Sequence, residues 1–485
     1  MAGYKHGAYV REESSSIAAP ITNNTGLHII FGTAPINKAE EPEKTVNQLI
    51  KAETYEEAVK KLGYSEDYEN YTLCQAMDVY FKLFAVGPVI FCNVLDPSKH
   101  RKENAEKEYD VINRQAVIDA EGILPDSLTV KSAGDVELVK DVDYVTSFTE
   151  KGNLIITLLT TGQGADEKAL KIKSASIEPE MVTEDDVIGG TDILTGKETG
   201  LELVRRVYPK FNNFPGYIMA PGWSHKKNVA AVMAAKCKEI NGVFRCECLI
   251  DIDTTTAKKY TDCEKIKEEN GILSESMIAL WPMALAGGRK FYYSAIYGAV
   301  SAKTDADNGS VPAMSPSNKL LNVDGAVLAD GTEINLDQPE ANTLNGQGIV
   351  TILNDGGMRS WGNNTAAYPY ITETKDRWIN CRRAFSWWGN SFIVACRENV
   401  DSSANYRQIE TIVDAENIKG NSYVQQGKFA GAKMEYVKSE NTVNDLLEGK
   451  IQVRQRLAPF TPTEYVLNIL SFDPSLLENA LGGNR

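Results

Sequence analysis

The stretch LELVRRVYPKFNNFPGYIMAPGWSHKKNVAAVMAAKCKEINGVFRCECLIDID, residues 201–253, carries four apolar segments in succession. Segments 201–211 and 228–241 have the apolar spacing of helices. Segments 216–222 and 245–253 are shorter apolar runs that end in Pro-Gly or in aspartates, which is typical of buried strands followed by turns. Helix and strand therefore alternate here, and this order predicts an α/β fold.

The beginning of the chain supplies elements of the same kind. The apolar run LHIIFGTAP at residues 27–35 predicts a buried strand. Two helices should follow, one capped by Thr54 and one beginning near Thr72, before a second apolar strand, GPVIFCNVL. Because neither part of the chain holds a complete sheet, we expect a discontinuous α/β core made of residues 21–100 and 200–340.

A segment of different character separates these two parts. Residues 101–199 contain short strands with alternating apolar side chains and Gly or Asp turns between them. This segment holds 21 Asp and Glu against 11 Lys and Arg, so it carries −10 of the −15 net charge of the chain. We expect an acidic, β-rich inserted domain here.

The last third of the chain predicts an α+β domain at 341–454 and an extended arm at 455–485. In the arm, Tyr465, Leu467 and Ile469 alternate with other residues and would share one face of a strand. A strand of this kind can pair with a sheet that belongs to another molecule. The whole chain is thus predicted to be a multidomain protein of mixed α/β and α+β structure.

The first twenty residues, which end in SSSIAAP, predict a second arm, with Tyr9 and Val10 as its contact residues. They contain no apolar segment of the kind found in signal peptides. No stretch of the chain approaches the ~20 apolar residues that a membrane span requires. We therefore expect folding in a cytoplasm without membrane insertion.

Composition limits the classes of partner. A hydrophobic share of 42% and a charged share of 24% are typical of a folded, globular chain. The net charge of −15 disfavours binding to nucleic acid or to an anionic membrane surface. The eight cysteines are scattered, mostly within apolar runs, which predicts reduced thiols in the core.

Three segments contain sequence motifs that secondary structure alone does not explain. They are YKHGAYVREESSSIAAP with the following GLHIIFGTAP, then SAKTDADNGSVPAMSPSNKLL at 301–321, and LNGQGIVTILNDGGMRSWGNNTAAYP at 344–369. In this order they resemble the contractile phage tail sheath family, which includes the sheaths of myophages and of R-type bacteriocins (tailocins). The residues that carry the motifs are Pro316, Ser317, Asn318, Leu344, Asn345, Gly348, Trp361 and Gly362. Family members often have a basic residue shortly after Trp361-Gly362, where this chain has Asn364.

The resemblance implies a structural protein and not an enzyme, with no cofactor, no metal and no catalytic residue. Subunits would stack in six-fold rings around an inner tail tube, and the sheath would contract to drive the tube through a cell envelope. The acidic insertion of residues 101–199 would project outward, where its charge keeps particles apart. The implied partners are other copies of the chain, the tube protein, the baseplate and the tail terminator. The particle would form in a bacterial cytoplasm as part of a virion or tailocin. The alternatives are another self-assembling tail or baseplate protein, or an α/β enzyme.

The segment RWINCRRAFSWWGNSF, residues 377–392, interleaves arginines with aromatic residues. In so acidic a chain this predicts a packed helix whose Arg377, Arg382 and Arg383 face an acidic protein surface. Within the proposed assembly we expect these arginines to face the tube.

Two further patterns invite a chemical interpretation. GGTDILTGKET, from Gly189, is similar to a phosphate-binding loop, but Lys197 is followed by Glu198 where such loops need Ser or Thr, so a plain loop is predicted. Asp251 and Asp253 follow a strand and could hold a cation or act as an acid and base pair. Carboxylates that are hydrogen-bonded within a turn are the favoured interpretation.

Overall fold

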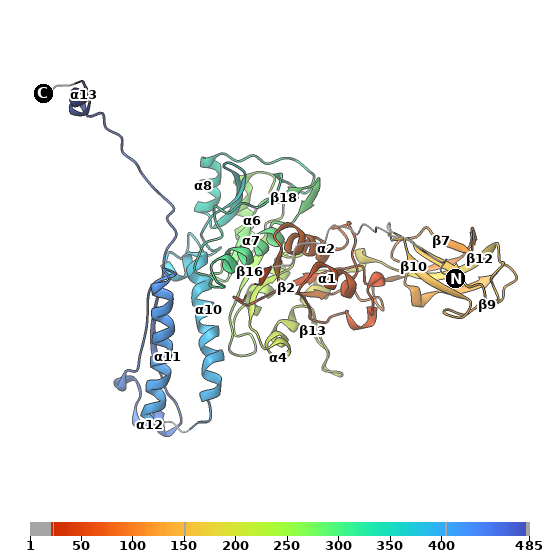
Figure 1. Ribbon diagram of the computed structural model, residues 1–485, viewed down its shortest axis with the longest axis horizontal. Helices are drawn as coiled ribbons and strands as arrows, with labels where there is room; N and C mark the ends of the chain where they lie inside the picture. Colours follow the sequence, from red (N-terminus) through yellow and green to blue (C-terminus); the bar gives the residue numbers. More distant parts are fainter. Residues whose placement is uncertain (1–20, 23, 150–151, 403–404, 482–485) are drawn as a thin grey trace, which may run out of the picture.

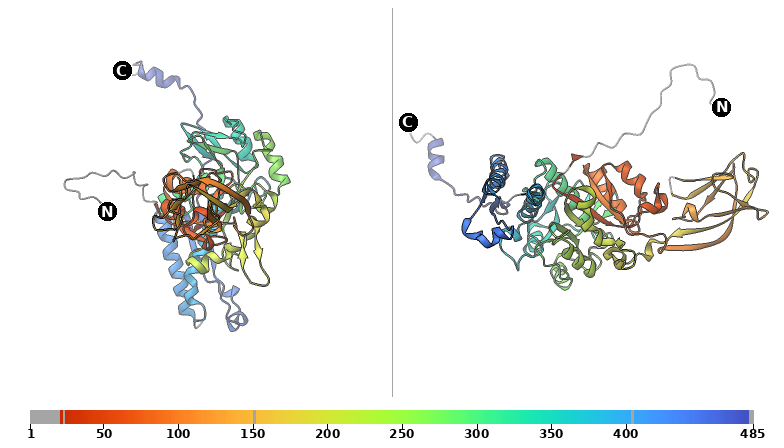
Figure 2. Two further views of the ribbon diagram at one scale, coloured as in Figure 1. Left: turned by 90° about the vertical axis from the view of Figure 1, so that its right-hand side faces the viewer. Right: turned by 90° about the horizontal axis from the view of Figure 1, so that it is seen from below.

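The structure is a computed structural model that describes residues 21–22, 24–149, 152–402 and 405–481 (Figure 1). The molecule is elongated, with a β-rich lobe at one end and long helices at the other (Figures 1 and 2). The predicted N-terminal arm, including Tyr9 and Val10, lies outside the described residues.

An eight-stranded sheet forms the centre of the body. Its order is β22 (Met358–Trp361), β21 (Ile349–Asn354), β17 (Met277–Leu280), β16 (Glu247–Asp251), β15 (Pro215–Met219), β2 (Leu27–Gly32), β5 (Val89–Asn93) and β3 (Ile50–Ala52). Neighbouring strands from β21 to β5 run parallel, and the two edge strands are antiparallel. Strands β2, β5, β15, β16 and β17 are buried almost throughout, as parallel strands covered on both faces must be. The predicted mixed α/β fold is confirmed, and β21 and β22 extend the sheet beyond residue 341.

Helix α1 (Tyr55–Leu62) begins and ends where local sequence signals place it. The Thr54 side chain accepts a hydrogen bond from the Glu57 amide, and Gly63 ends the helix at φ +76°. Helix α2 (Thr72–Met77) continues as a π-helical turn, and α7 (Tyr293–Asp307) packs on β15 and β16. Helix α5 (Lys227–Lys236) also packs on β16, and α3 (Glu184–Ile188) packs against α5.

The β-rich lobe has a hydrophobic core of its own. It consists of two antiparallel sheets, which contain β6 (Arg101–Asp110), β12 (Ala169–Ile177), β8 (Thr129–Ser132) and β9 (Glu137–Leu138) in one and β10 (Tyr144–Phe148), β11 (Leu154–Leu158) and β7 (Gln115–Ile118) in the other. Arg101 and Ile177 are partners in register, so the lobe leaves and rejoins the body at one place. Residues 179–199, expected within the insertion, instead form α3 and a hairpin beside the body.

The apolar run ESMIALWPMAL at residues 275–285 has a sequence that is also compatible with a helix. It forms β17 and then β18 (Met283–Ala286), which pairs with β19 (Arg289–Phe291) and β20 (Gly325–Val327). A short apolar run is compatible with both a strand and a helix. Here the position between β16 and β21 in the sheet favours a strand. Pro282 lacks an amide hydrogen and disfavours a helical residue before it.

The C-terminal part combines helices with a two-stranded sheet. Helices α10 (Ile379–Cys396) and α11 (Tyr406–Gln425) are the long helices of Figure 1, and α11 contacts β23 (Phe429–Glu435), which pairs with β24 (Arg454–Pro459). Helix α8 (Gln338–Gly346) packs on β21, and α12 (Val443–Leu447) lies near the tip of α11. After β24 the chain leaves the body and ends in α13 (Pro474–Ala480) (Figures 1 and 2).

Candidate functional site

The C-terminal segment 460–473 is the part of the described chain that is best prepared to bind another molecule. It belongs to no helix or strand and extends away from the body. Its apolar side chains face solvent, with exposed fractions of 77% for Tyr465, 63% for Leu467 and 80% for Ile469. An extended apolar segment whose backbone groups are unpaired is a template for strand pairing.

Specific contacts fix the root of this segment. The Asn380 side-chain amide donates a hydrogen bond of 2.9 Å to the Phe460 carbonyl, and the Asn363 side-chain amide donates one of 3.1 Å to the Glu464 carboxylate. The Arg377 guanidinium lies 3.6 Å from the same carboxylate. The arm is therefore anchored up to Glu464, whereas residues 465–473 extend freely from that anchor.

The motif residues meet at one junction beside β22. Ser317 Oγ accepts a hydrogen bond of 3.0 Å from the Gly362 amide, and the Asn318 amide donates one of 2.6 Å to the Ser360 carbonyl. The Asn345 side chain donates to the Trp361 carbonyl at 3.0 Å. Segments 301–321 and 344–369, separate in sequence, are thus bonded together in space.

The remaining motif residues complete the same junction. Pro316 and Leu344 are buried, and Trp361 is half-buried. Gly348 has φ +66°, and a Cβ atom there would lie 2.5 Å from the Thr365 carbonyl oxygen, so the turn requires glycine. These positions hold backbone turns together, and they place no reactive group at a surface.

A buried ion pair joins α10 to the body. The Arg383 guanidinium binds both carboxylate oxygens of Asp305 on α7, with Nη1 at 3.1 Å from Oδ1. Thr25, just before β2, donates a hydrogen bond of 2.9 Å to the same carboxylate. Both charged side chains are buried, and burial raises the pKa of the Asp305 carboxyl although Arg383 opposes this. Arg383 therefore lies inside the protein, and the expectation that it faces the tube is corrected.

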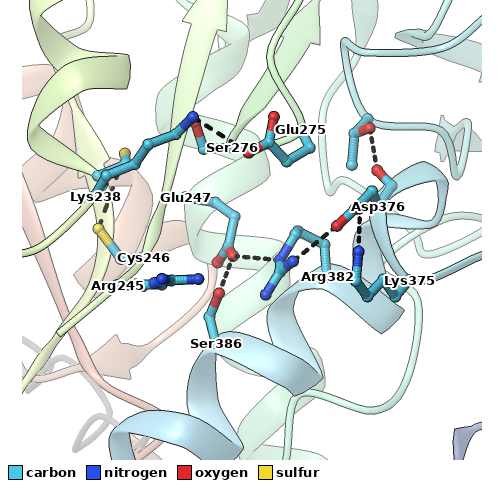
Figure 3. Close-up of polar contacts among 12 residues, drawn as sticks. Lys238, Arg245, Cys246, Glu247, Glu275, Ser276, Lys375, Asp376, Arg382 and Ser386 are labelled. Atoms are coloured by element: carbon cyan, nitrogen blue, oxygen red, sulfur yellow. Dashed lines mark hydrogen bonds and ion pairs between the residues drawn. The ribbon is translucent and has the colours of Figure 1, made fainter. Parts of the chain in front are cut away.

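The neighbouring arginine belongs to a second buried contact, shown in Figure 3. Glu247 of β16 accepts a hydrogen bond of 2.6 Å from Ser386 Oγ and lies 3.9 Å from Arg382 Nε. Arg382 also binds the Asp376 carboxylate at 2.8 Å. Burial raises the pKa of Glu247, while Arg382 and Ser386 oppose that shift. We call Thr25, Glu247, Asp305, Arg382, Arg383 and Ser386 the polar joint.

Arg377 is the most exposed of the three predicted arginines. Its guanidinium lies 4.4 Å from the centre of the Tyr368 ring and 4.0 Å from that of the Trp378 ring, and it donates to Asn364 at 2.9 Å. Asn364 thus accepts a hydrogen bond from a guanidinium of the same chain. The acidic surface expected for these arginines consists of carboxylates of the same chain.

Asp305 and Glu247 were missed in the sequence. Glu247 stands inside the apolar run RCECLIDID, and a charged residue in a buried strand requires a buried partner. The sequence therefore indicates that Glu247 needs a buried partner. It does not indicate which residue that partner is, since Ser386 lies 139 positions away.

Asp251 and Asp253 have different surroundings. Asp251 is buried and accepts hydrogen bonds from Ser224 Oγ at 2.9 Å, from the Ser294 amide at 2.8 Å and from Ser294 Oγ at 2.5 Å. Asp253 accepts from the amide and hydroxyl of Thr255. Asp253 is therefore a turn carboxylate, as the favoured interpretation expects. Asp251 is also satisfied, but by tertiary contacts with Ser224 and with Ser294 at the start of α7.

We predict that Asp251→Asn changes the pH dependence of stability. Burial raises the pKa of the Asp251 carboxyl from 3.8 to about 6, although the serine hydrogen bonds oppose this shift. Its ionisation therefore lowers the stability of the folded state as pH rises from 4 to 6 and above, by about 3 kcal/mol in total. Urea unfolding between pH 4.5 and 7.5 should show the variant gaining stability relative to wild type as pH rises.

Asp253→Asn is the matched control. Burial raises the pKa of Asp253, but the Thr255 hydrogen bonds and the nearby His225 outweigh it and leave the pKa below its usual value. That variant should differ from wild type in stability by an amount that stays constant between pH 4.5 and 7.5, because a carboxyl whose pKa lies below 3.8 is ionised in both the folded and the unfolded state throughout this range. A stability difference between Asp251→Asn and wild type that is constant with pH would contradict the first prediction.

The described residues show no cluster that could hold a metal ion. Among them, no three His, Cys, Asp or Glu side chains are grouped as a metal site requires. All eight cysteines are free, and seven are buried; burial raises the pKa of Cys74 to about 12, which keeps its thiol protonated. No helix in the described ranges is long and apolar enough to cross a membrane.

Similarity to known proteins extends over the whole length of the chain. No protein-family model matches the sequence. The tail sheath protein of Burkholderia phage BcepMu is 24% identical over 499 residues, which cover 100% of both chains. The major tail sheath protein of Serratia phage KSP20 is 24% identical over 323 residues, which cover 65% of this chain and 78% of that protein. The chain is a relative of tail sheath proteins.

Solved structures agree with these sheath relatives. A chain in the cryo-EM structure of the anti-feeding prophage baseplate has a TM-score of 0.61 at 14% identity and covers 97% of this chain and 100% of its own length. A chain of the PVC sheath complex, from an extracellular contractile injection system in the contracted state, has a TM-score of 0.57 at 13% identity, with 98% and 99% covered. The predicted resemblance to the tail sheath family is confirmed, and the fold is that of sheath structures.

Proposed function

We propose that this chain is the structural subunit of a contractile tail sheath, which polymerises around an inner tube and contracts to drive the tube through a cell envelope. The observation that carries the proposal is the exposed apolar arm beyond Glu464, on a chain whose sheath relative matches it from end to end. A monomer gains nothing from exposing that arm, whereas a polymer buries it.

The arm supplies a physical mechanism for linking subunits. Residues 465–473 would add a strand to a sheet of a neighbouring copy, so that main-chain hydrogen bonds hold the two copies together. Among the described residues no further strand pairs with the two-stranded sheet of β23 and β24, so its edges make it a suitable acceptor. Links of this kind persist while the bodies reorient, which contraction requires.

Contraction then consumes no chemical energy at the moment when it occurs. The extended lattice would be a kinetically trapped state of higher free energy, and the contracted lattice would bury more surface between subunits. Each subunit contributes little free energy, but the contributions of all subunits in the array add up.

The shape of the subunit supports an orientation in the sheath. The β-rich lobe and the α10–α11 region lie at opposite ends of the long axis (Figure 1). If the β-rich lobe of residues 101–177 faces outward, the C-terminal part faces the tube. We propose the tube protein, the baseplate and the tail terminator as the further partners, and we propose no catalytic role.

Microscopy of the purified protein tests the proposal directly. Tubes with a regular helical lattice, which shorten and widen on destabilisation, support a contractile sheath. Rings of constant length support a different tail or baseplate component, and single particles at all concentrations contradict self-assembly.

We predict that Leu467→Pro strongly impairs assembly while Leu467→Thr impairs it less. Proline removes one amide donor and disfavours pairing on both sides, whereas threonine keeps the amide and favours extended backbone. Since Leu467 is exposed in the monomer, neither change should affect folding. The critical concentration for polymerisation should rise about tenfold or more for proline over threonine, because a lost ladder bond costs over 1 kcal/mol. Equal values for both variants would exclude main-chain pairing of the arm.

A further inference from the structure

The hairpin of β13 (Gly190–Thr191) and β14 (Glu198–Thr199) exposes two large aliphatic side chains at its tip. The exposed fractions of Ile193 and Leu194 are 97% and 96%, so neither side chain contacts the rest of the chain. In Figure 1 the hairpin extends from the lower side of the body near β13. Single exposed apolar residues are common, but two adjacent ones on a projecting tip need a reason.

The hairpin is held in one shape before any partner binds. The Asp192 carboxylate accepts hydrogen bonds of 2.8 Å from the amides of Leu194 and Thr195, which fixes the tip. At the root, Gly189 has φ +68°, and a Cβ atom there would lie 1.9 Å from the Thr199 carbonyl oxygen. A preorganised tip loses little conformational entropy on binding.

Ion pairs also hold the base of the hairpin in place. Glu198 is buried, and both Arg205 and Arg206 bind its carboxylate, the latter at 2.7 and 2.8 Å. The Gly200 amide donates a hydrogen bond of 2.9 Å to the Asn47 side chain. These contacts connect the hairpin rigidly to the body, so a force or a contact at the tip is transmitted to it.

A pocket of matching character is lined by residues of β18, of β19 and of the loop around Tyr68. In Figure 1, β18 lies on the side of the body opposite the hairpin. The pocket lining includes the apolar or aromatic residues Tyr68, Met283 and Tyr292. It also includes residues of both signs of charge, which we call the rim: Glu66, Asp67, Glu69, Arg289 and Lys290. The tip carries both signs too, since Asp192 and Lys197 flank the two aliphatic side chains.

We propose that Ile193 and Leu194 of one subunit insert into the pocket beside β18 of a second copy of this chain. The inference rests on the proposed function, because it assumes that copies stack. A projection on one side and a pocket on the opposite side make a head-to-tail contact, which repeats without limit and suits a stacked array. Lys197 then lies near the acidic rim residues and Asp192 near the basic ones.

The test replaces the tip in the full-length chain. Ile193→Ser together with Leu194→Ser should raise the critical concentration for sheath assembly by about tenfold or more, since two buried aliphatic side chains are lost from each contact. The thermal midpoint of the monomer should not change, because both residues are exposed. Val139→Ser with Val142→Ser is the matched control, because these two valines are also exposed but lie on the outward lobe, and it should assemble as wild type does.

Zero-length cross-linking identifies the receiving surface. In sheaths assembled from a mixture of isotopically light and heavy subunits, Lys197 should couple between chains to Glu66, Asp67 or Glu69, and Lys197→Gln should remove the product. Coupling of Lys197 to a different surface, or normal assembly by the double-serine variant, would overturn the inference. Binding of the wild type to phospholipid vesicles that is lost in that variant, with assembly unchanged, would overturn it in favour of a membrane contact.

The two levels of failure are distinguishable. If wild-type protein forms no tubes, the proposed function fails. If wild type and the double-serine variant form tubes equally, the sheath function stands and the hairpin contact is wrong.

Discussion

Removal of residues 465–485 is expected to leave a folded monomer that forms no sheaths. The truncation keeps β24 and the anchor of the arm, including the hydrogen bond between Asn380 and the Phe460 carbonyl and the contacts of Glu464. The side chains that it removes up to Leu481 are exposed in the monomer, so the core loses no packing. The polymer, by contrast, loses every strand that the arm would donate.

Three measurements check this expectation. Circular dichroism and thermal unfolding should match the full-length monomer, light scattering should give one subunit per particle, and microscopy should show no tubes at concentrations where the full chain polymerises. Residues 1–20, the other proposed arm, can be removed in the same way with the same expected loss. Tubes of normal length from the 465–485 truncation would refute the linking role of this arm.

Replacement of Arg383 by methionine should destabilise the monomer more than any other single change proposed for this chain. The variant leaves the Asp305 carboxylate buried with Thr25 as a hydrogen-bond donor but without its cation. Loss of one partner of a buried ion pair costs about 3–5 kcal/mol, because the remaining charge is uncompensated. We expect the free energy of unfolding at pH 7, measured in urea, to fall by about this amount.

The pH dependence separates this cause from a simple loss of packing. Protonated Asp305 needs no cation, so the deficit of Arg383→Met should shrink as the pH is lowered from 7 to 5. The double variant Arg383→Met with Asp305→Asn should recover part of the loss. Arg456→Met is the control, since Arg456 forms an exposed ion pair with Glu435 at 3.1 Å and its loss should cost under about 1 kcal/mol. A deficit of Arg383→Met that does not vary with pH would exclude an uncompensated carboxylate as its cause.

Local signals in the sequence predicted the elements they control. Thr54 and Gly63 mark the ends of α1, and the alternation at Tyr465, Leu467 and Ile469 marks an extended segment, because these features depend on neighbours in the chain. Within residues 275–285 local signals leave strand and helix open, because only the position of this segment between β16 and β21 in the sheet distinguishes the two.

Such local signals could not predict the contacts within the polar joint. The pairing of Arg383 with Asp305 spans 78 positions, and the sequence around Arg383 is equally compatible with an exposed basic helix. The apolar tip at Ile193 and Leu194 was visible in the sequence, but its significance depends on a hairpin that holds both side chains away from the body. In each case the missing information is tertiary.

The β-rich lobe has a consequence for engineering the particle. It has its own core, and its first and last residues, Arg101 and Ile177, are adjacent in register, so the chain enters and leaves through one narrow neck. A foreign domain whose termini lie similarly close could be grafted there without redirecting the backbone of the body. Each subunit would then display one cargo, and the helical array would set the spacing between cargoes as a scaffold does.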